Sequence, residues 1–106
     1  MTEKIALDAY VIDTLLADLV GHDRRIAAFA VYLYLWRHTW GAGAGELSAS
    51  HQTIASDTGL SKSAVQVALR HLRRRKLIQT RQEFATATPS HRVLRPWRRK
   101  SSTALR

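Results

Sequence analysis

Cysteine is absent from the sequence, and proline occurs only twice among its 106 residues. Without cysteine the chain can form neither a disulfide nor a thiolate metal site, so a reducing cytoplasm is the expected compartment. The scarcity of proline, together with 45% apolar and 24% charged residues, favours a folded chain over a disordered one. This length fits one domain with a modest hydrophobic core.

Long apolar runs are lacking as well. The most apolar stretch, IAAFAVYLYLW at 26–36, has 11 residues, whereas a helix that crosses a membrane needs about 20. The first ten residues mix acidic with apolar positions, and no apolar signal segment follows them. We therefore expect no membrane contact and interpret 26–36 as a buried helix.

Positive charge is abundant but confined to one part of the chain. Residues 1–61 carry 4 basic and 7 acidic side chains, a net charge of −3. Residues 62–106 carry 13 basic and 1 acidic side chain, a net charge of +12, which brings the whole chain to +9. This asymmetry indicates a polyanionic partner for the C-terminal half, most simply a nucleic acid.

Two helices are predicted before residue 40. The first, over 7–20, has apolar residues at helical spacing, and Gly21 is a suitable end. Asp23 can then cap a second helix that runs to about residue 38. This second helix is apolar nearly all round, so we expect it at the centre of the fold. The apolar positions of the first helix are Leu7, Val11, Leu15 (or Leu16) and Leu19.

The stretch IASDTGLSKSAVQVAL at 54–69 predicts two helices joined by a tight turn. Ser48 or Ser50 can cap a short helix that ends near Thr58. Gly59 can adopt the positive φ that such a turn requires. Ser61 can then cap a longer helix over 62–75. Two short helices joined in this way form a helix-turn-helix.

The segment IASDTGLSKSAVQVALRHLRRRKLI at 54–78 resembles the helix-turn-helix of bacterial winged-helix regulators, typically IAxxTGLSxxTVxxALxxLxxxGLI. The resemblance covers about 30 residues, and the segments 76–82 and 91–97 match the two strands of a wing. It implies a mainly α fold with a small β-wing, preceded by two N-terminal helices. Proteins of this kind bind duplex DNA, usually as dimers, with the second helix in the major groove.

The resemblance also implies the division of the chain. A single winged helix-turn-helix domain would span 1–97, with N-terminal helices at 7–39, the helix-turn-helix at 48–76 and the wing at 77–97. Residues 98–106 would form a basic disordered tail. The family usually has glycine before the final Leu-Ile, where this chain has Lys76. Either Lys76 bears the cost of a left-handed conformation, about 1–2 kcal/mol, or the helix ends differently.

The resemblance implies two kinds of DNA contact. Ser63, Gln66 and Arg70 are expected to read base edges, since glutamine pairs with adenine and arginine with guanine. Val67 borders this face and can meet a thymine methyl group. No asparagine occurs in the chain, so glutamine is the only residue whose side-chain amide can recognise adenine. Phosphate contacts are expected from Ser50, His51, Gln52, Ser61, Lys62, Arg73 and Arg74, and from Arg81, Arg92 and Arg95 in the wing. The alternative for these arginines is an ordinary solvated surface.

A homodimer is predicted from the second helix, which is apolar all round in a chain too small to cover it. Core packing is the alternative for its aromatic residues, and Trp97 is expected to pack on the domain. The residues expected at the dimer interface are Val11, Leu15, Leu19, Phe29, Tyr32 and Trp36.

Other functions have little support in the sequence. The segment GAGAGE at 41–46 lacks the Gly-Lys-Ser/Thr of a phosphate loop and is interpreted as a linker. The five histidines do not fall at metal-ligand spacing, so we expect no metal, no cofactor and no enzyme activity. We expect a cytoplasmic, nucleoid-associated transcriptional regulator. The alternatives are a plasmid or phage replication or partition initiator, an RNA-binding protein, and a protein-interaction module built on a winged helix.

Overall fold

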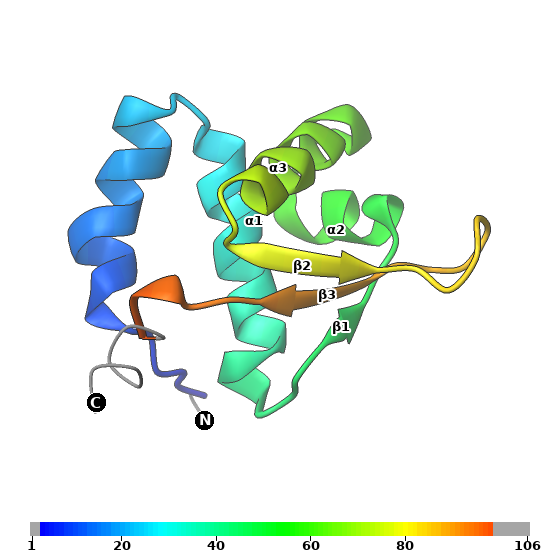
Figure 1. The fold of residues 1–106 in the computed structure, drawn as a ribbon, viewed down its shortest axis with the longest axis horizontal. Helices are drawn as coiled ribbons and strands as arrows, with labels where there is room; N and C mark the ends of the chain where they lie inside the picture. Colours follow the sequence, from blue (N-terminus) through cyan, green and yellow to red (C-terminus); the bar gives the residue numbers. More distant parts are fainter. Residues whose placement is uncertain (1–2, 99–106) are drawn as a thin grey trace, which may run out of the picture.

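The computed structural model describes residues 3–98 (Figure 1). The predicted basic tail lies, from residue 99 onward, outside the described residues. The fold is mainly α with a small β-sheet, as predicted, and the sheet is antiparallel with three strands, one more than predicted. The elements in chain order are the π-helical segments η1 (Val11–Leu15) and η2 (Ala17–His22), α1 (Ile26–His38), the 3-10 turn η3 (Trp40–Ala42), β1 (Leu47–Ser48), α2 (His51–Thr58), α3 (Lys62–Arg74), β2 (Ile78–Arg81) and β3 (Ser90–Val93).

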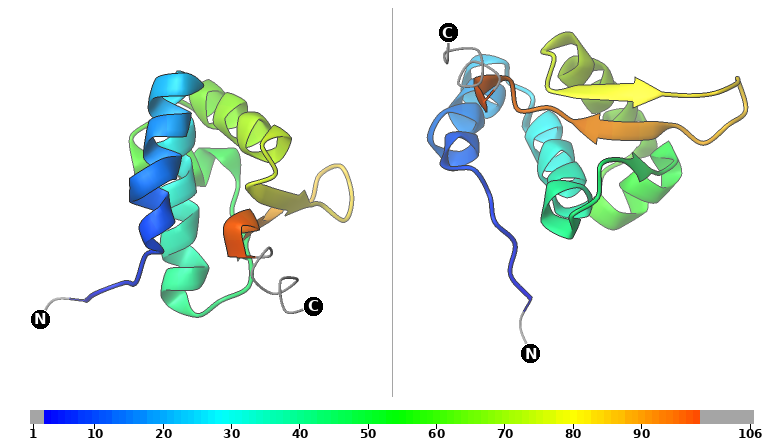
Figure 2. Two further views of the ribbon diagram at one scale, coloured as in Figure 1. Left: turned by 60° about the vertical axis from the view of Figure 1, so that its left-hand side comes forward. Right: turned by 60° about the horizontal axis from the view of Figure 1, so that its bottom comes forward.

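The first helical segment, formed by η1 and η2, lies alongside α1 (Figure 2). Val11, Leu15 and Leu19 repeat at steps of four and are all buried. Gly21 does not end this segment, because η2 continues through His22. The helix end predicted at Gly21 is therefore wrong, because the helical segment ends at His22 and the chain turns after that residue.

The turn between η2 and α1 differs from the sequence prediction in its cap. Arg25 is the N-cap residue of α1, and no side chain caps the helix there. Asp23 was predicted to be the cap, but its carboxylate is bonded elsewhere, to His22, His71 and Arg75. Those partners outcompete a cap because they surround the carboxylate with three N–H donors from side chains.

Helix α1 is central, as predicted, and is covered within the protein itself. The first helical segment lies on one side of α1, while α3, α2 and β3 also pack against it. The predicted dimer interface is therefore wrong, because each of its residues is at most 9% exposed in the single chain. These residues are Val11, Leu15, Leu19, Phe29, Tyr32 and Trp36.

The sheet has the strand order β1-β3-β2 and is antiparallel throughout. Strand β1 was not predicted; two residues are too few for any alternation to be visible in the sequence. Its Ser48 pairs with Ser90 of β3, and the two hydroxyl oxygens are 2.8 Å apart. This pairing ties the segment before α2 to the loop end of the hairpin formed by β2 and β3. The hairpin occupies the position of the predicted wing.

Lys76 follows α3 with a φ of 59°, so it is in the left-handed conformation that the family pattern assigns to glycine. The Lys76→Gly variant is expected to raise the free energy of unfolding by about 1 kcal/mol, because glycine adopts this conformation without the Cβ clash. Urea unfolding of the variant and the parent protein measures this difference. Lys76→Ala is the matched control, since it removes the side chain and keeps the strain. Equal stability of the two variants would contradict the prediction.

Candidate nucleic-acid interface

The two helices α2 and α3 and the turn between them are defined by three local features, all as predicted. The Ser50 hydroxyl accepts a hydrogen bond from the amide of Thr53 at 3.1 Å, so Ser50 and not Ser48 caps α2. Gly59 has a φ of +81°. The Ser61 hydroxyl accepts from the amide of Ala64 at 3.0 Å and caps α3. The conformation of Gly59 ends α2, and the Ser61 cap starts α3 directly after it.

Helix α3 has one buried and one exposed face. Val65, Ala68, Leu69 and Leu72 are buried in the core. Within residues 3–98, no basic side chain of the opposite face is in an ion pair, so its charges are available to a ligand. The exposed face consists of Lys62, Ser63, Gln66, Val67, Arg70, Arg73 and Arg74.

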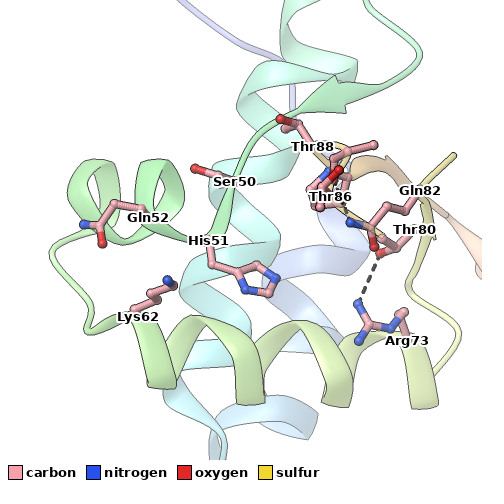
Figure 3. A pocket seen from close by; sticks show the side chains of 11 residues that line it. Ser50, His51, Gln52, Lys62, Arg73, Thr80, Gln82, Thr86 and Thr88 are labelled. Carbon is pink, nitrogen blue, oxygen red and sulfur yellow. Dashed lines mark hydrogen bonds between the residues drawn. The ribbon is translucent and has the colours of Figure 1, made fainter. Parts of the chain in front are cut away.

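A concave surface lies beside α3, between the start of α2 and the hairpin (Figure 3). It brings together Ser50, His51 and Gln52 of the predicted phosphate contacts with Lys62 and Arg73 of α3. Sequence reasoning missed the residues that the hairpin contributes to it. The hairpin residues that line this surface are Thr80, Gln82, Thr86, Ala87, Thr88 and Pro89.

Arg73 is held in place at this surface by the sheet. Its guanidinium donates to the Thr80 hydroxyl at 3.2 Å (Figure 3). That hydroxyl lies 3.0 Å from Nδ1 of His91, to which it can donate in turn. Burial lowers the pKa of His91 to about 4, so its imidazole is neutral at neutral pH and can accept this bond. The arrangement orients Arg73 before any ligand arrives.

The positive charge of the concave surface comes from Lys62 and Arg73 alone at neutral pH. His51 lies between them, and partial burial with the nearby charges of Lys62 and Arg73 lowers its pKa. A neutral His51 can still donate one hydrogen bond to a phosphate oxygen. The surface therefore combines two fixed positive charges with several neutral donors, a composition suited to a phosphate backbone.

The predicted contacts in the hairpin are only partly available. The exposed Arg81 forms ion pairs with Glu46 at 2.8 Å and with Glu83 at 3.5 Å. Because two carboxylates offset its charge, it contributes little attraction for an anion. Arg92 is exposed on the outer face of the sheet. The hairpin is consequently much less basic than its sequence suggests.

Arg95 was predicted to contact DNA, but its guanidinium is bound to other residues of the domain. Its guanidinium lies 3.3 Å from the Asp8 carboxylate and 3.8 Å from the centroid of the Trp40 ring. The indole N–H of Trp97 donates to the same carboxylate at 3.0 Å, and its ring stacks on Tyr10. Trp97 therefore packs on the domain, as predicted. Arg95 is bound because Asp8, 87 residues earlier, lies beside it.

No group of three or more histidine, aspartate or glutamate side chains in residues 3–98 could hold a metal ion. Over the same residues, every helix is too short or too polar to cross a membrane.

Residues 27–78 match the family model of a helix-turn-helix domain. The match begins in α1, includes α2 and α3, and ends at the first residue of β2. Within the matched residues α2 and α3 are the two helices joined by the turn at Gly59, and α3 occupies the position of the second helix. Comparison with curated proteins and with solved structures gave no significant match.

Proposed function

We propose that the protein binds duplex DNA in a sequence-specific manner and regulates transcription. The observation that carries this proposal is the exposed face of α3, where unpaired basic side chains surround Gln66 and Ser63 within a helix-turn-helix domain. Such a face combines groups that read base edges with groups that bind phosphate. The protein would act in the cytoplasm, on the nucleoid, without a cofactor and without catalysis.

In the proposed complex α3 lies in the major groove. Gln66 would pair with adenine through its side-chain amide, and Arg70 would donate two hydrogen bonds to guanine. Ser63 would bond to either base, and Val67 would meet a thymine methyl group. Lys62 and Arg73, with the residues at the start of α2, would bind the backbone along the concave surface.

The Arg70→Ala variant is expected to lose about 1–3 kcal/mol of binding free energy on the preferred sequence and to relax the preference at one base pair. The reason is that a two-bond contact to guanine is lost, while most of the backbone contacts remain. Titration of fluorescent duplexes that differ at single positions measures both effects. Arg37→Ala is the matched control, because Arg37 lies at the end of α1 and binds Glu3. Equal weakening on all sequences would show that Arg70 contacts phosphate only.

Selection of bound duplexes from a random DNA pool at about 150 mM salt tests the proposed function itself. An enriched sequence is the expected result. Two-fold symmetric half-sites about one helical turn apart would support a homodimer on DNA, whose contacts would lie outside the buried core. Binding without enrichment would contradict sequence-specific recognition. Absence of binding would overturn the DNA-binding function.

Two other functions use the same fold. A replication or partition initiator would bind DNA with the same face of α3 but would require repeated sites or a larger partner. A protein-interaction module would leave the unpaired arginines of α3 without a role, unless its partner is acidic. Competition between duplex DNA, RNA and single-stranded DNA for the protein separates DNA binding from the remaining alternatives.

A further inference from the structure

Two arginines at the turn between η2 and α1 have no role in the interactions described so far. Arg24 and Arg25 are both exposed, and within residues 3–98 neither forms an ion pair. Arg24 has a φ of 58°, a left-handed conformation that is unusual for a residue with a side chain. We refer to Arg24 and Arg25 as the arginine corner.

The arginine corner lies against the flank of α3 that faces away from the hairpin. In Figure 1 the turn lies to the left of α3, and the loop that joins β2 to β3 lies to its right. Figure 2 also draws the two segments far apart. A shallow hollow joins the corner to α3, whereas the concave surface takes Lys62 and Arg73 from the other flank. The hollow is lined by Arg24, Arg25, Ile26, Ala27, Ala28, Ser63, Ala64, Val67 and Ala68.

The position of the arginine corner relative to α3 is fixed by Asp23. Its carboxylate lies 2.7 Å from Nε2 of His71, in the last turn of α3, and 2.9 Å from Nε of Arg75, the residue that follows α3. Hydrogen bonds from His22 and His71, together with the Arg75 charge, lower the pKa of Asp23 to about 2, so it stays ionised. The backbone of Arg25 is also held, because its N–H donates to the carbonyl of Leu19 at 2.7 Å.

We propose that the arginine corner binds phosphates of duplex DNA on the side of the major groove opposite the hairpin. This inference rests on the proposed function, since it requires α3 in the groove. With α3 inserted, one backbone would run along the concave surface and the other along the arginine corner. Two exposed guanidinium groups without a carboxylate partner suit phosphate, to which arginine can donate two parallel hydrogen bonds.

The hollow itself suits the close approach of a DNA backbone. Three of its residues on the α3 side have small side chains, Ser63, Ala64 and Ala68. At its edge Ile26 is 69% exposed and Val67 is 37% exposed. These two apolar side chains offer a surface for a sugar or a thymine methyl group beside the charged contacts.

The Arg24→Gln/Arg25→Gln double variant tests the proposal by its salt dependence. Each phosphate contact contributes about −0.9 to the slope of log K against log salt, so losing two should reduce the slope by about 1.8. The parent should then lose roughly tenfold more affinity than the variant between about 50 and 200 mM salt. The matched control is Lys4→Gln/Arg37→Gln, which removes the same charge at the far end of α1.

Equal slopes for the arginine-corner variant and the control would overturn the proposal. Hydroxyl-radical footprinting adds a positional test, in which the variant should lose protection only on the side of the site away from the hairpin. If the parent protein binds no duplex DNA at all, the proposed function fails, and that result is distinct from equal slopes on a protein that does bind.

The Arg24→Gly variant separates binding from folding. Glycine relieves the left-handed strain at this position, so the melting temperature should be unchanged or higher. DNA affinity should nevertheless fall several-fold, because one phosphate contact is lost. A fall in melting temperature with unchanged affinity would mean that Arg24 has a structural role only.

Discussion

An increase in salt from about 50 to 200 mM is expected to weaken binding to duplex DNA by about 10³-fold. About six phosphate contacts would produce this effect, since each contributes about −0.9 to the slope of log K against log salt. Fluorescence anisotropy of a labelled duplex over this salt range measures the slope. Circular dichroism at both salt concentrations controls for loss of fold.

The expected slope follows from the charges that are free in the structure and not from the formal charge of +9. Arg81 and Arg95 are held by carboxylates and are left out of the sum. A slope close to −5.4 would support six contacts, whereas about −3.6 would mean that the arginine corner takes no part. A slope near zero would contradict phosphate binding. The six exposed side chains expected to contact phosphate are Lys62, Arg73, Arg74, Arg92, Arg24 and Arg25.

Trp36→Ala is expected to lower the free energy of unfolding by about 3–5 kcal/mol. The Trp36 ring is 2% exposed and packs between Tyr32 and Trp40. Its indole N–H donates to the carbonyl of Ala6 at 2.8 Å, which ties the N-terminal segment to α1. Urea unfolding followed by circular dichroism measures the loss. Trp36→Phe keeps an aromatic ring in the core and should lower the free energy of unfolding by less. It replaces the alanine variant in this measurement if that variant does not fold.

The same experiment distinguishes a core residue from an interface residue. Because Trp36 is buried in the single chain, the loss of stability should be independent of protein concentration. Ile12→Ala is the matched control, since Ile12 is 49% exposed on the outside of η1 and its truncation should change stability by less than about 0.5 kcal/mol. A loss for Trp36→Ala that shrinks as the concentration rises would contradict the assignment to the core.

The helix-turn-helix could be predicted from the sequence because each of its parts is local. The hydroxyls of Ser50 and Ser61 accept from amides three residues further on, and the N–H of Gly59 donates to a carbonyl four residues earlier, so their spacing is visible in the chain. The exposed face of α3 follows from helical periodicity for the same reason. Lys76 is the instructive exception to the pattern: it keeps the backbone conformation of glycine and bears the strain.

Two differences between prediction and structure concern charges whose partners are distant in sequence. Asp23 was expected to cap α1 but is bound to α3, 48 and 52 residues further on. Arg95 was expected to reach DNA but is bound to Asp8. The predicted dimer interface is wrong for a related reason, since η1 and η2 cover the apolar face of α1 within the single chain. None of these pairings has a signal in local sequence, because each depends on how whole elements pack.

The loop at the end of the hairpin is closed by hydrogen bonds of the Gln82 side chain and of its own backbone. The Nε2 of Gln82 lies 3.1 Å from the carbonyl oxygen of Ala85 and 2.6 Å from that of Ala87, and it can donate to both. The amide of Ala87 also donates to the carbonyl of Phe84. These bonds close the loop in the free protein. Docking of the hairpin against DNA would therefore cost little conformational entropy, and more of the contact energy would remain as affinity.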